Sequence, residues 1–362
     1  MPPRPLDRIT IEGYKSIRRM EDFPLHNLNV LIGANGAGKS NFISFFSLLH
    51  DLAQGNLQVS VARSGGANAL LYLGQKTTQA MHFSLGFGDD GYQFTLAPGS
   101  GDELFFTEEE VFQGVNQAEY LGGGQKESLL PATSSTNRKL SIADEVLASI
   151  KDWRVYHFHD TSASAGVKRM GALDDNAVLR ADASNLAAFL YLLHETREEY
   201  YEQIVAAIRL AAPFFDDFSL RPNPLIPQKI QLEWREKGSD AYFNAHMLSD
   251  GTLRFMCLAT LLLQPSLPST ILIDEPELGL HPYALVLLAS LLKGAAERTQ
   301  VIISTQSASL VNQFGPGDII VVDRVAGESV FGRRSTDDLE SWLDEYGMGD
   351  LWEKNLLGGR PE

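Results

Sequence analysis

Short apolar runs separated by glycine-rich turns recur along the chain and predict a protein built from both strands and helices. Ile271–Ile273 is apolar at every position, which is typical of a fully buried central strand. Leu28–Ile32 is a second β-prone run, and Arg8–Glu12 alternates polar and apolar residues as a half-buried strand does. Trp153–Phe158 and Val301–Thr305 predict two more strands.

Two stretches predict antiparallel hairpins. Met81–Phe87 and Tyr92–Leu96 alternate around Asp89-Asp90-Gly91, and an Asp-Gly turn between alternating runs is a strong hairpin signal. Residues 231–234 and 241–244 flank a second polar turn. Part of the β structure is therefore expected to be antiparallel.

Helices are predicted where apolar residues recur at helical spacing. The pattern indicates a buried helix over residues 41–49, an amphipathic helix over 139–151, a helical section over 184–211 and an apolar helix over 253–263. Residues 54–80 are predicted to be mostly loop. A strand over 319–322, a hairpin and a helix near 339–346 are expected at the C-terminal end.

These elements predict an α/β fold with a mixed sheet, an antiparallel β-subdomain at the N-terminal end and an inserted helical lobe. The expected divisions are residues 1–125 for the first part of the core, 126–245 for the helical lobe, 246–335 for the second part of the core and 336–362 for a C-terminal helix and tail.

Composition narrows the classes of function. The formal net charge is −16, so the chain as a whole is not attracted to the phosphate backbone of nucleic acid, although a local basic patch could still bind it. Cys257 is the single cysteine and lies in an apolar run, which favours a buried residue in a reducing compartment. No secretory signal and no run long enough to span a bilayer is evident. A soluble, cytoplasmic protein without a membrane partner is expected.

The stretch Gly33–Ser40 fits G-x-x-x-x-G-K-[ST] at every position and lies between a predicted strand and a predicted helix. Glycines let backbone N–H groups curl around phosphate oxygens, and the following helix directs its positive end at the same phosphates. Lys39 can reach the β- and γ-phosphates, and the Ser40 hydroxyl can bind Mg²⁺. The alternative is a glycine-rich turn that binds nothing.

Asp274 and Glu275 follow directly after the buried strand that ends at Ile273. In α/β sheets, ligands bind at this end of the strands. Asp274 would hold Mg²⁺, and Glu275 would orient or deprotonate the water that attacks the γ-phosphate. A strand that merely ends in solvated acids is the alternative, which the presence of Gly33–Ser40 makes the weaker one.

Two further stretches are open to more than one interpretation. Leu248–Thr252 precedes an apolar helix, where Ser249 or Asp250 could simply be its N-cap. His157, His159 and Asp160 have a spacing that a metal site could use, but no further clustered ligands are evident.

The order of these motifs resembles that of ABC-type ATPases, with Leu248–Thr252 in the place of their Leu-Ser-Gly-Gly-Gln signature. The resemblance implies a P-loop NTPase fold with an ABC-type head, ATP as the nucleotide, and two subunits that sandwich two nucleotides head to tail. Ser249 and Gly251 would cap the γ-phosphate bound by the other subunit. Asp250 departs from the pattern and adds negative charge near that phosphate, and Thr252 departs from it as well.

Within ABC-type ATPases the chain is most similar to the RecF/SMC/OLD-like branch, through Ile11–Ile17, Asn35–Asn41 and Glu275–Pro282. The resemblance implies that Lys15 or Ser16 lies near the nucleotide. Gln306 stands where ABC-type ATPases carry a switch histidine. A Gln-loop glutamine is not evident, and the loop after Phe158 is its positional candidate. Neither SMC-type coiled-coil arms nor a Toprim domain is expected. The nucleotide-binding residues implied are Asn35, Gly36, Ala37, Gly38, Lys39, Ser40 and Asn41.

Three functions compete. The first is an ATP-hydrolysing, dimer-forming switch that uses Mg²⁺ and acts on a separate effector protein, of the kind found in bacterial phage defence, with Lys39, Glu275 and Gln306 as catalytic residues. The second is a RecF-like DNA-repair ATPase that binds DNA directly, against which the acidity of the chain argues. The third is the nucleotide-binding subunit of a transporter, which the Glu277–Pro282 segment and the missing switch histidine disfavour.

Overall fold

The computed structural model describes residues 4–114, 117–133, 142–334 and 346–359. Its first part is an antiparallel sheet in which every neighbouring pair of strands runs in opposite directions. The order across this sheet is β2 (Ile17–Pro24), β1 (Arg8–Tyr14), β4 (Met81–Phe87), β5 (Asp90–Pro98), β6 (Leu104–Gln113) and β7 (Gln117–Gly122). The predicted antiparallel N-terminal subdomain is confirmed.

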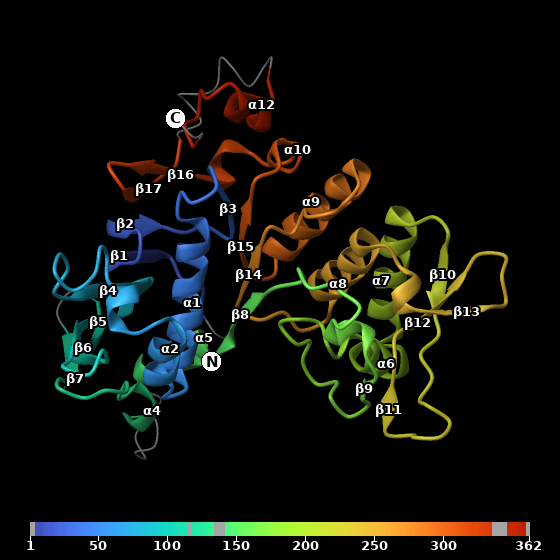
Figure 1. Ribbon diagram of the computed structural model, residues 1–362, viewed down its shortest axis with the longest axis horizontal. Coiled ribbons are helices and arrows are strands. Elements are labelled where there is room, and N and C mark those ends of the chain that lie inside the picture. Colours follow the sequence, from blue (N-terminus) through green and yellow to red (C-terminus); the bar gives the residue numbers. More distant parts are fainter. Residues whose placement is uncertain (1–3, 115–116, 134–141, 335–345, 360–362) are drawn as a thin grey trace.

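The second sheet forms the centre of the molecule in Figure 1. Its order is β17 (Glu328–Gly332), β16 (Ile319–Val325), β3 (Leu28–Ile32), β15 (Gln300–Thr305), β14 (Thr270–Asp274) and β8 (Trp153–Tyr156). The strands from β16 to β8 are parallel, and only β17 is antiparallel to its neighbour. The carboxyl ends of β3 and β14, which carry two of the predicted motifs, therefore lie at one edge of the sheet.

Two hydrophobic cores lie on opposite faces of this central sheet, because successive strand residues point to opposite sides. On β14, Leu272 packs into the core shared with the antiparallel sheet, whereas Ile271 and Ile273 pack into the core shared with the lobe. Helix α1 (Lys39–Ala53) fills the first core, where Phe45 stacks on Phe83 with ring centroids 4.8 Å apart. Each such buried aromatic side chain contributes roughly 1.5–3 kcal/mol.

The lobe is drawn green to yellow in Figure 1 and extends from β8 on the side opposite the antiparallel sheet. It contains two small sheets, β10–β12–β13 and β11–β9, and the helices α6 and α7. Helix α8, from the second part of the core, packs against α7. The bounds are β9 (Gly171–Ala172), α6 (Leu186–Thr196), α7 (Glu198–Ala211), β10 (Phe215–Phe218), β11 (Lys229–Ile230), β12 (Glu233–Glu236), β13 (Tyr242–Asn244) and α8 (Asp250–Leu263). The predicted second hairpin is confirmed as β12 and β13, which pair through Trp234 and Phe243.

The remaining elements are short except for α5 and α9, and they cover the sheets or join them. They are α2 (Leu57–Arg63), α3 (Ala67–Leu70), α4 (Leu130–Thr133), α5 (Ile142–Asp152), α9 (Pro282–Ala296), α10 (Ala308–Val311), α12 (Met348–Glu353), η1 (Gly166–Lys168), η2 (Ala245–Met247) and η3 (Pro316–Asp318). Within the described ranges, none of the helices combines the length and apolar content needed to cross a membrane.

Several expectations are corrected. The helical section over 184–211 is two helices, α6 and α7, because Arg197 leaves the helical region at φ −145°, and no glycine or proline lies there to signal the break. The first hairpin turns at Gly88 and Asp89, since Phe87 pairs with Asp90 and Gly88 supplies the positive φ of 66°. Strands β6 and β7 and the short helices α2 and α3 were not predicted.

The C-terminal strand is confirmed as β16, and the expected hairpin partner is β17. The helix expected near 339–346 falls almost entirely outside the described residues. Domain boundaries stay a prediction. Within the span 126–245 assigned to the lobe, β8 is itself an edge strand of the central sheet beside β14.

Candidate functional site

The phosphate loop Gly33–Ser40 connects β3 to α1, and its glycines hold backbone shapes that other residues rarely adopt. Gly38 is the N-cap of α1 at φ 122°, and a Cβ there would lie 2.1 Å from Ser329 Oγ. At Gly33, with φ 155°, a Cβ would lie 2.2 Å from the Val322 carbonyl oxygen. Both positions therefore need glycine, for conformation and for space.

Residues far away in the sequence hold the loop in place. Ser329 Oγ on β17 lies 2.7 Å from Ser16 Oγ and donates to the Ala37 carbonyl, and Asn41 Nδ2 donates to Ser16 Oγ at 2.7 Å. Arg324 Nη1 donates to the Gly36 carbonyl at 2.9 Å. The predicted residues Ser16 and Asn41 are thus brought to the loop. Sequence reasoning missed Ser329 and Arg324, for which the chain carries no local signal.

Lys15 points elsewhere. Its Nζ donates to Ser44 Oγ on α1 at 2.8 Å and lies 5.3 Å from the centre of the Tyr14 ring. Burial lowers the pKa of the Lys15 ammonium. Of the two candidates at this turn, Ser16 bonds to Asn41 and to Ser329, which itself holds the phosphate loop, whereas Lys15 contacts α1 one turn after Ser40.

Lys39 is buried, with 5% of its surface exposed. Its Nζ donates to the carbonyl oxygens of Gly33 at 2.6 Å and Ala34 at 3.1 Å. Burial lowers the pKa of this ammonium, and the nearby carboxylates of Glu275 and Asp274 oppose that shift. A cation is therefore held between the loop and the acids Asp274 and Glu275 at the carboxyl end of β14, as phosphate binding requires.

Ser40 and Asp274 form the pair that the sequence predicts for Mg²⁺. Ser40 Oγ donates to Asp274 Oδ2 at 3.2 Å, and Ser304 Oγ on the neighbouring strand β15 donates to Asp274 Oδ1. Asp274 and Ser304 are direct partners in the parallel register, which places them side by side. Hydroxyl and carboxylate oxygens are suitable Mg²⁺ ligands, and nucleotide phosphates usually supply others. No group of three His, Cys, Asp or Glu side chains in the described part of the chain could hold a metal by itself.

Glu275 adopts the left-handed conformation, with φ 44°, directly after the strand. Its backbone N–H donates to the Ser304 carbonyl at 2.9 Å, and its Oε1 accepts a hydrogen bond from Gln306 Nε2. Strained backbone of this kind costs about 1–3 kcal/mol and is common where a side chain must be aimed. The structure thus brings Gln306 and Glu275 together.

Glu277 is an acid that sequence reasoning did not assign. Its Oε1 accepts from the backbone N–H of Gln306 at 2.8 Å, while its buried Oε2 has no hydrogen-bond partner in the part of the protein that the structure describes. Burial is the largest effect on the pKa of Glu277 and raises it. Hydrogen bonds oppose this rise, and the charge of Glu275 adds to it. Gln306 is therefore held by the carboxyl groups of Glu275 and Glu277. The sequence signal for the role of Glu277 was its position two residues after Glu275.

The signature stretch lies at the start of α8. Ser249 is the N-cap, with its Oγ accepting from the Thr252 N–H at 3.2 Å. A Cβ at Gly251 would lie 2.1 Å from the Gly279 carbonyl oxygen, so this helix end packs closely on the segment after Glu277. Among the described residues, no hydrogen bond or ion pair joins Ser249 or Gly251 to the phosphate loop. The signature stretch and the phosphate loop of one chain are therefore not joined by hydrogen bonds or ion pairs from Ser249 or Gly251.

Arg254 on α8 links three segments around the site. Its Nη1 donates to the Leu278 carbonyl at 2.6 Å, and its Nε and Nη2 each donate at 2.9 Å to the carbonyls of Phe158 and His159. The rings of His157 and His159 lie 6.2 Å apart, and burial lowers the pKa of His157. The loop after β8 is thus tied to the signature helix by Arg254.

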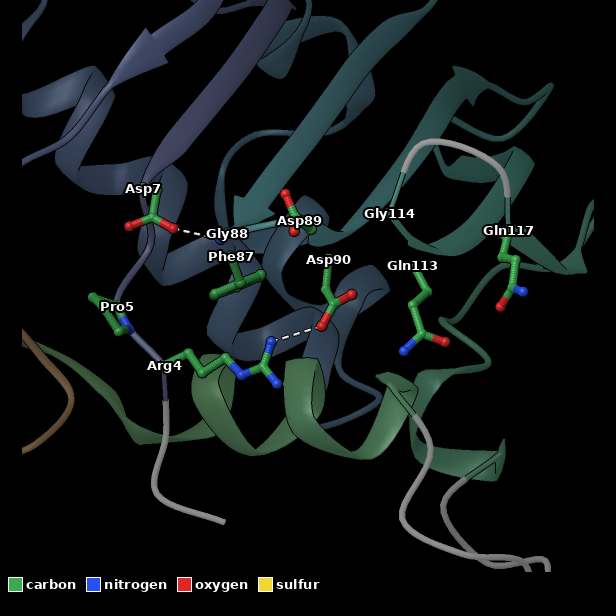
Figure 2. Close-up of a pocket in the computed structure, with 10 residues that line it drawn as sticks. All are labelled: Arg4, Pro5, Asp7, Phe87, Gly88, Asp89, Asp90, Gln113, Gly114 and Gln117. Carbon is green, nitrogen blue, oxygen red and sulfur yellow. Dashed lines mark hydrogen bonds and ion pairs between the residues drawn. The ribbon is translucent and has the colours of Figure 1, made fainter.

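Cavities of about 440 and 490 Å³ border Ala34 and Asn35 of the phosphate loop. A cavity of about 830 Å³ lies elsewhere, between the N-terminal segment and the turns of the antiparallel sheet (Figure 2). Arg4 pairs with Asp90 there at 2.6 Å, and none of the motif residues lines it. Size alone does not mark the chemical site in this protein.

Comparisons with known proteins agree with this geometry. A family model described as "AAA domain, putative AbiEii toxin, Type IV TA system" matches residues 28–312. A search of curated proteins gave no match.

Among solved structures, an Smc head bound to the C-winged helix domain of ScpA is similar, with 15% identity, a TM-score of 0.59, and coverage of 93% of this chain and 99% of that one. An Smc head with an extended coiled coil, bound to the C-terminal domain of ScpA derived from Pyrococcus furiosus, has 15% identity, a TM-score of 0.57, and coverage of 94% and 99%. At this identity the likeness establishes the fold. The chain belongs to the AAA-domain family that its family match describes, and it has the fold of an ABC-type P-loop ATPase head.

Proposed function

We propose that this chain is a Mg²⁺-dependent ATPase that dimerises head to tail around two ATP molecules and passes that state to a separate effector protein. The observation that carries the proposal is the arrangement of the motifs. Lys39, Ser40, Asp274, Glu275 and Gln306 meet at one edge of the central sheet, whereas the signature stretch lies at the start of α8 without polar contact to them.

The residues at the sheet edge would have different roles in phosphoryl transfer. The backbone N–H groups at the start of α1 and the Lys39 ammonium bind the phosphates. Ser40 and Asp274 would hold Mg²⁺, which neutralises charge that develops on the β- and γ-oxygens. Glu275 accepts a proton from the attacking water, and the Gln306 amide holds that carboxylate in its strained position.

A second copy would complete the site. Ser249 and the first turn of α8 present a hydroxyl and unpaired backbone N–H groups, which suit the γ-phosphate held by a partner. Binding of ATP would then shift the chain between an open and a closed dimer.

The effector and the biological setting are inferred from the comparisons. The family description names an AbiEii toxin and a toxin–antitoxin system, and the two similar Smc heads are each bound to a domain of ScpA. These support an ATPase that works on a second protein, and we place it in bacterial phage defence.

The test is the Glu275→Gln chain in ATP and Mg²⁺, with Lys39→Ala as the control. Removing the base should lower turnover by about 10²–10⁴-fold and trap the closed dimer, which sedimentation can measure. Lys39→Ala should stay monomeric. A Glu275→Gln chain that binds ATP but remains monomeric would contradict the dimer.

The same variant identifies the partner. Tagged Glu275→Gln, recovered from its native cells in ATP and Mg²⁺, should retain an effector protein that Lys39→Ala does not. Recovery of duplex DNA without a protein partner would overturn the effector proposal and support a repair ATPase.

A further inference from the structure

The signature loop of this chain carries an acid where a phosphate is expected to bind. Asp250 is the first residue of α8, directly between Ser249 and Gly251, and its side chain is 64% exposed. The start of a helix attracts anions through its free N–H groups and its dipole. A carboxylate at this position therefore repels a phosphate that approaches the same helix end.

A lysine is buried directly behind that acid. The side chain of Lys168 is 8% exposed, and its Nζ lies 3.9 Å from Asp250 Oδ1. The same Nζ donates to the Thr161 carbonyl at 2.5 Å. At 3.9 Å the contact with Asp250 is an ion pair without a hydrogen bond. A buried ammonium is costly without a counter-charge, and Asp250 is an acid that faces Lys168.

The backbone around Lys168 fixes this relation. Lys168 ends the short helix η1, which packs against η2, the turn directly before the signature loop. Thr161 belongs to the loop after β8, which Arg254 ties to α8 through the Phe158 and His159 carbonyls. The ammonium therefore joins the loop after β8 to the signature loop.

We propose that Lys168 is a positioning residue for the signature loop. Its ammonium offsets the charge of Asp250, and the loop can therefore accept the γ-phosphate held by a second copy although it contains an acid. The inference rests on the proposed head-to-tail dimer. It resolves the departure at Asp250, because the loop is close to neutral when the acid is paired.

The experiment uses the Glu275→Gln chain as the parent, with Lys168→Gln, Asp250→Asn and the double variant built into it. Glutamine removes the charge of Lys168 but keeps a donor for the Thr161 carbonyl. Dimer affinity in ATP and Mg²⁺ is measured by sedimentation. We expect Lys168→Gln to weaken the dimer by about tenfold or more, and Asp250→Asn added to it to restore affinity to within about threefold of the parent.

Two controls separate charge from packing. Lys237→Met removes an exposed lysine on the β12–β13 turn and should leave dimer affinity unchanged. Raising the salt concentration should narrow the deficit of Lys168→Gln, since screening weakens repulsion between the exposed acid and the phosphate. A purely structural role for Lys168 would show neither rescue by Asp250→Asn nor this salt dependence.

An unchanged dimer in Lys168→Gln, or no rescue in the double variant, would overturn the inference. If the parent itself stays monomeric, the proposed function fails separately. The interaction between Lys168 and Asp250 is then tested by thermal unfolding of the parent, the two single variants and the double variant without nucleotide. Losses of stability that are coupled support the interaction, and losses that are additive overturn it. If Lys168→Gln does not fold, thermal unfolding is compared between Asp250→Asn and the double variant. A double variant that also fails to fold overturns the inference.

Discussion

The phosphate loop and the signature loop both contain glycine and both start a helix, but the chain supports them very differently. The phosphate loop is contacted by side chains from β14, β16 and β17, Ser16 in the turn before β2 bonds to Ser329 behind it, and Gly38 and Lys39 are buried. The signature loop exposes Ser249 and Asp250, and Gly279 and Lys168 approach it from distant parts of the sequence.

The difference shows which half of the site one chain can complete. A loop fixed by four distant segments holds its shape before any ligand arrives, which lowers the cost of binding. The exposed start of α8 has its binding surface ready, but within the described residues no hydrogen bond or ion pair joins Ser249 or Gly251 to the phosphate loop of the same chain. The comparison therefore predicts a site that is shared between two chains.

The largest effect should come from mixing two defective chains. Lys39→Ala lacks the phosphate loop's cation and Ser249→Ala lacks the signature hydroxyl, so each alone should lose about 10²-fold or more in turnover. A mixed dimer would pair the intact phosphate loop of the Ser249→Ala chain with the intact signature loop of the Lys39→Ala chain, so an equal mixture should hydrolyse ATP faster than either chain alone. Steady-state ATP hydrolysis measures this, and a mixture as inactive as its components would break the comparison.

Replacing glycine in the phosphate loop should have the next largest effect. In Gly38→Ala the new Cβ would lie 2.1 Å from Ser329 Oγ at φ 122°, so we expect about 3 kcal/mol of lost stability and loss of nucleotide binding. Gly36→Ala is the matched control, because no atom lies within 4 Å of its Cβ and only the φ of 78° is strained, at about 1 kcal/mol. Thermal unfolding and binding of a fluorescent nucleotide distinguish the two, and equal losses would show that Ser329 does not support the loop.

The smallest effect concerns Glu277. Burial raises its pKa above the ordinary value, so the folded chain holds this proton more tightly than the unfolded chain, and stability falls as pH rises through the folded pKa. Glu277→Gln removes the buried charge and should stabilise the chain by roughly 1 kcal/mol at neutral pH. The gain should shrink as pH falls toward 4.5, the ordinary pKa. Unfolding curves at several pH values test this, and a gain that does not vary with pH would contradict it.

The sequence by itself determined the parts of this protein that lie in contiguous residues. Gly33–Ser40, Asp274-Glu275 and the alternating β4–β5 strands were all predictable, because a loop that cradles phosphate, a strand end and a hairpin each depend on neighbours in the chain. The resemblance to ABC-type ATPases then supplied the fold and the expected place of Gln306.

Only the tertiary structure decided what the distant residues do. Ser329 and Arg324 support the phosphate loop, Glu277 and Glu275 hold Gln306, and Lys168 faces Asp250, all through contacts between segments far apart in the sequence. The break at Arg197 and the order of the central strands were likewise not predictable locally. Periodicity reports which face of an element is buried, but the packing of whole layers selects the residue that it meets.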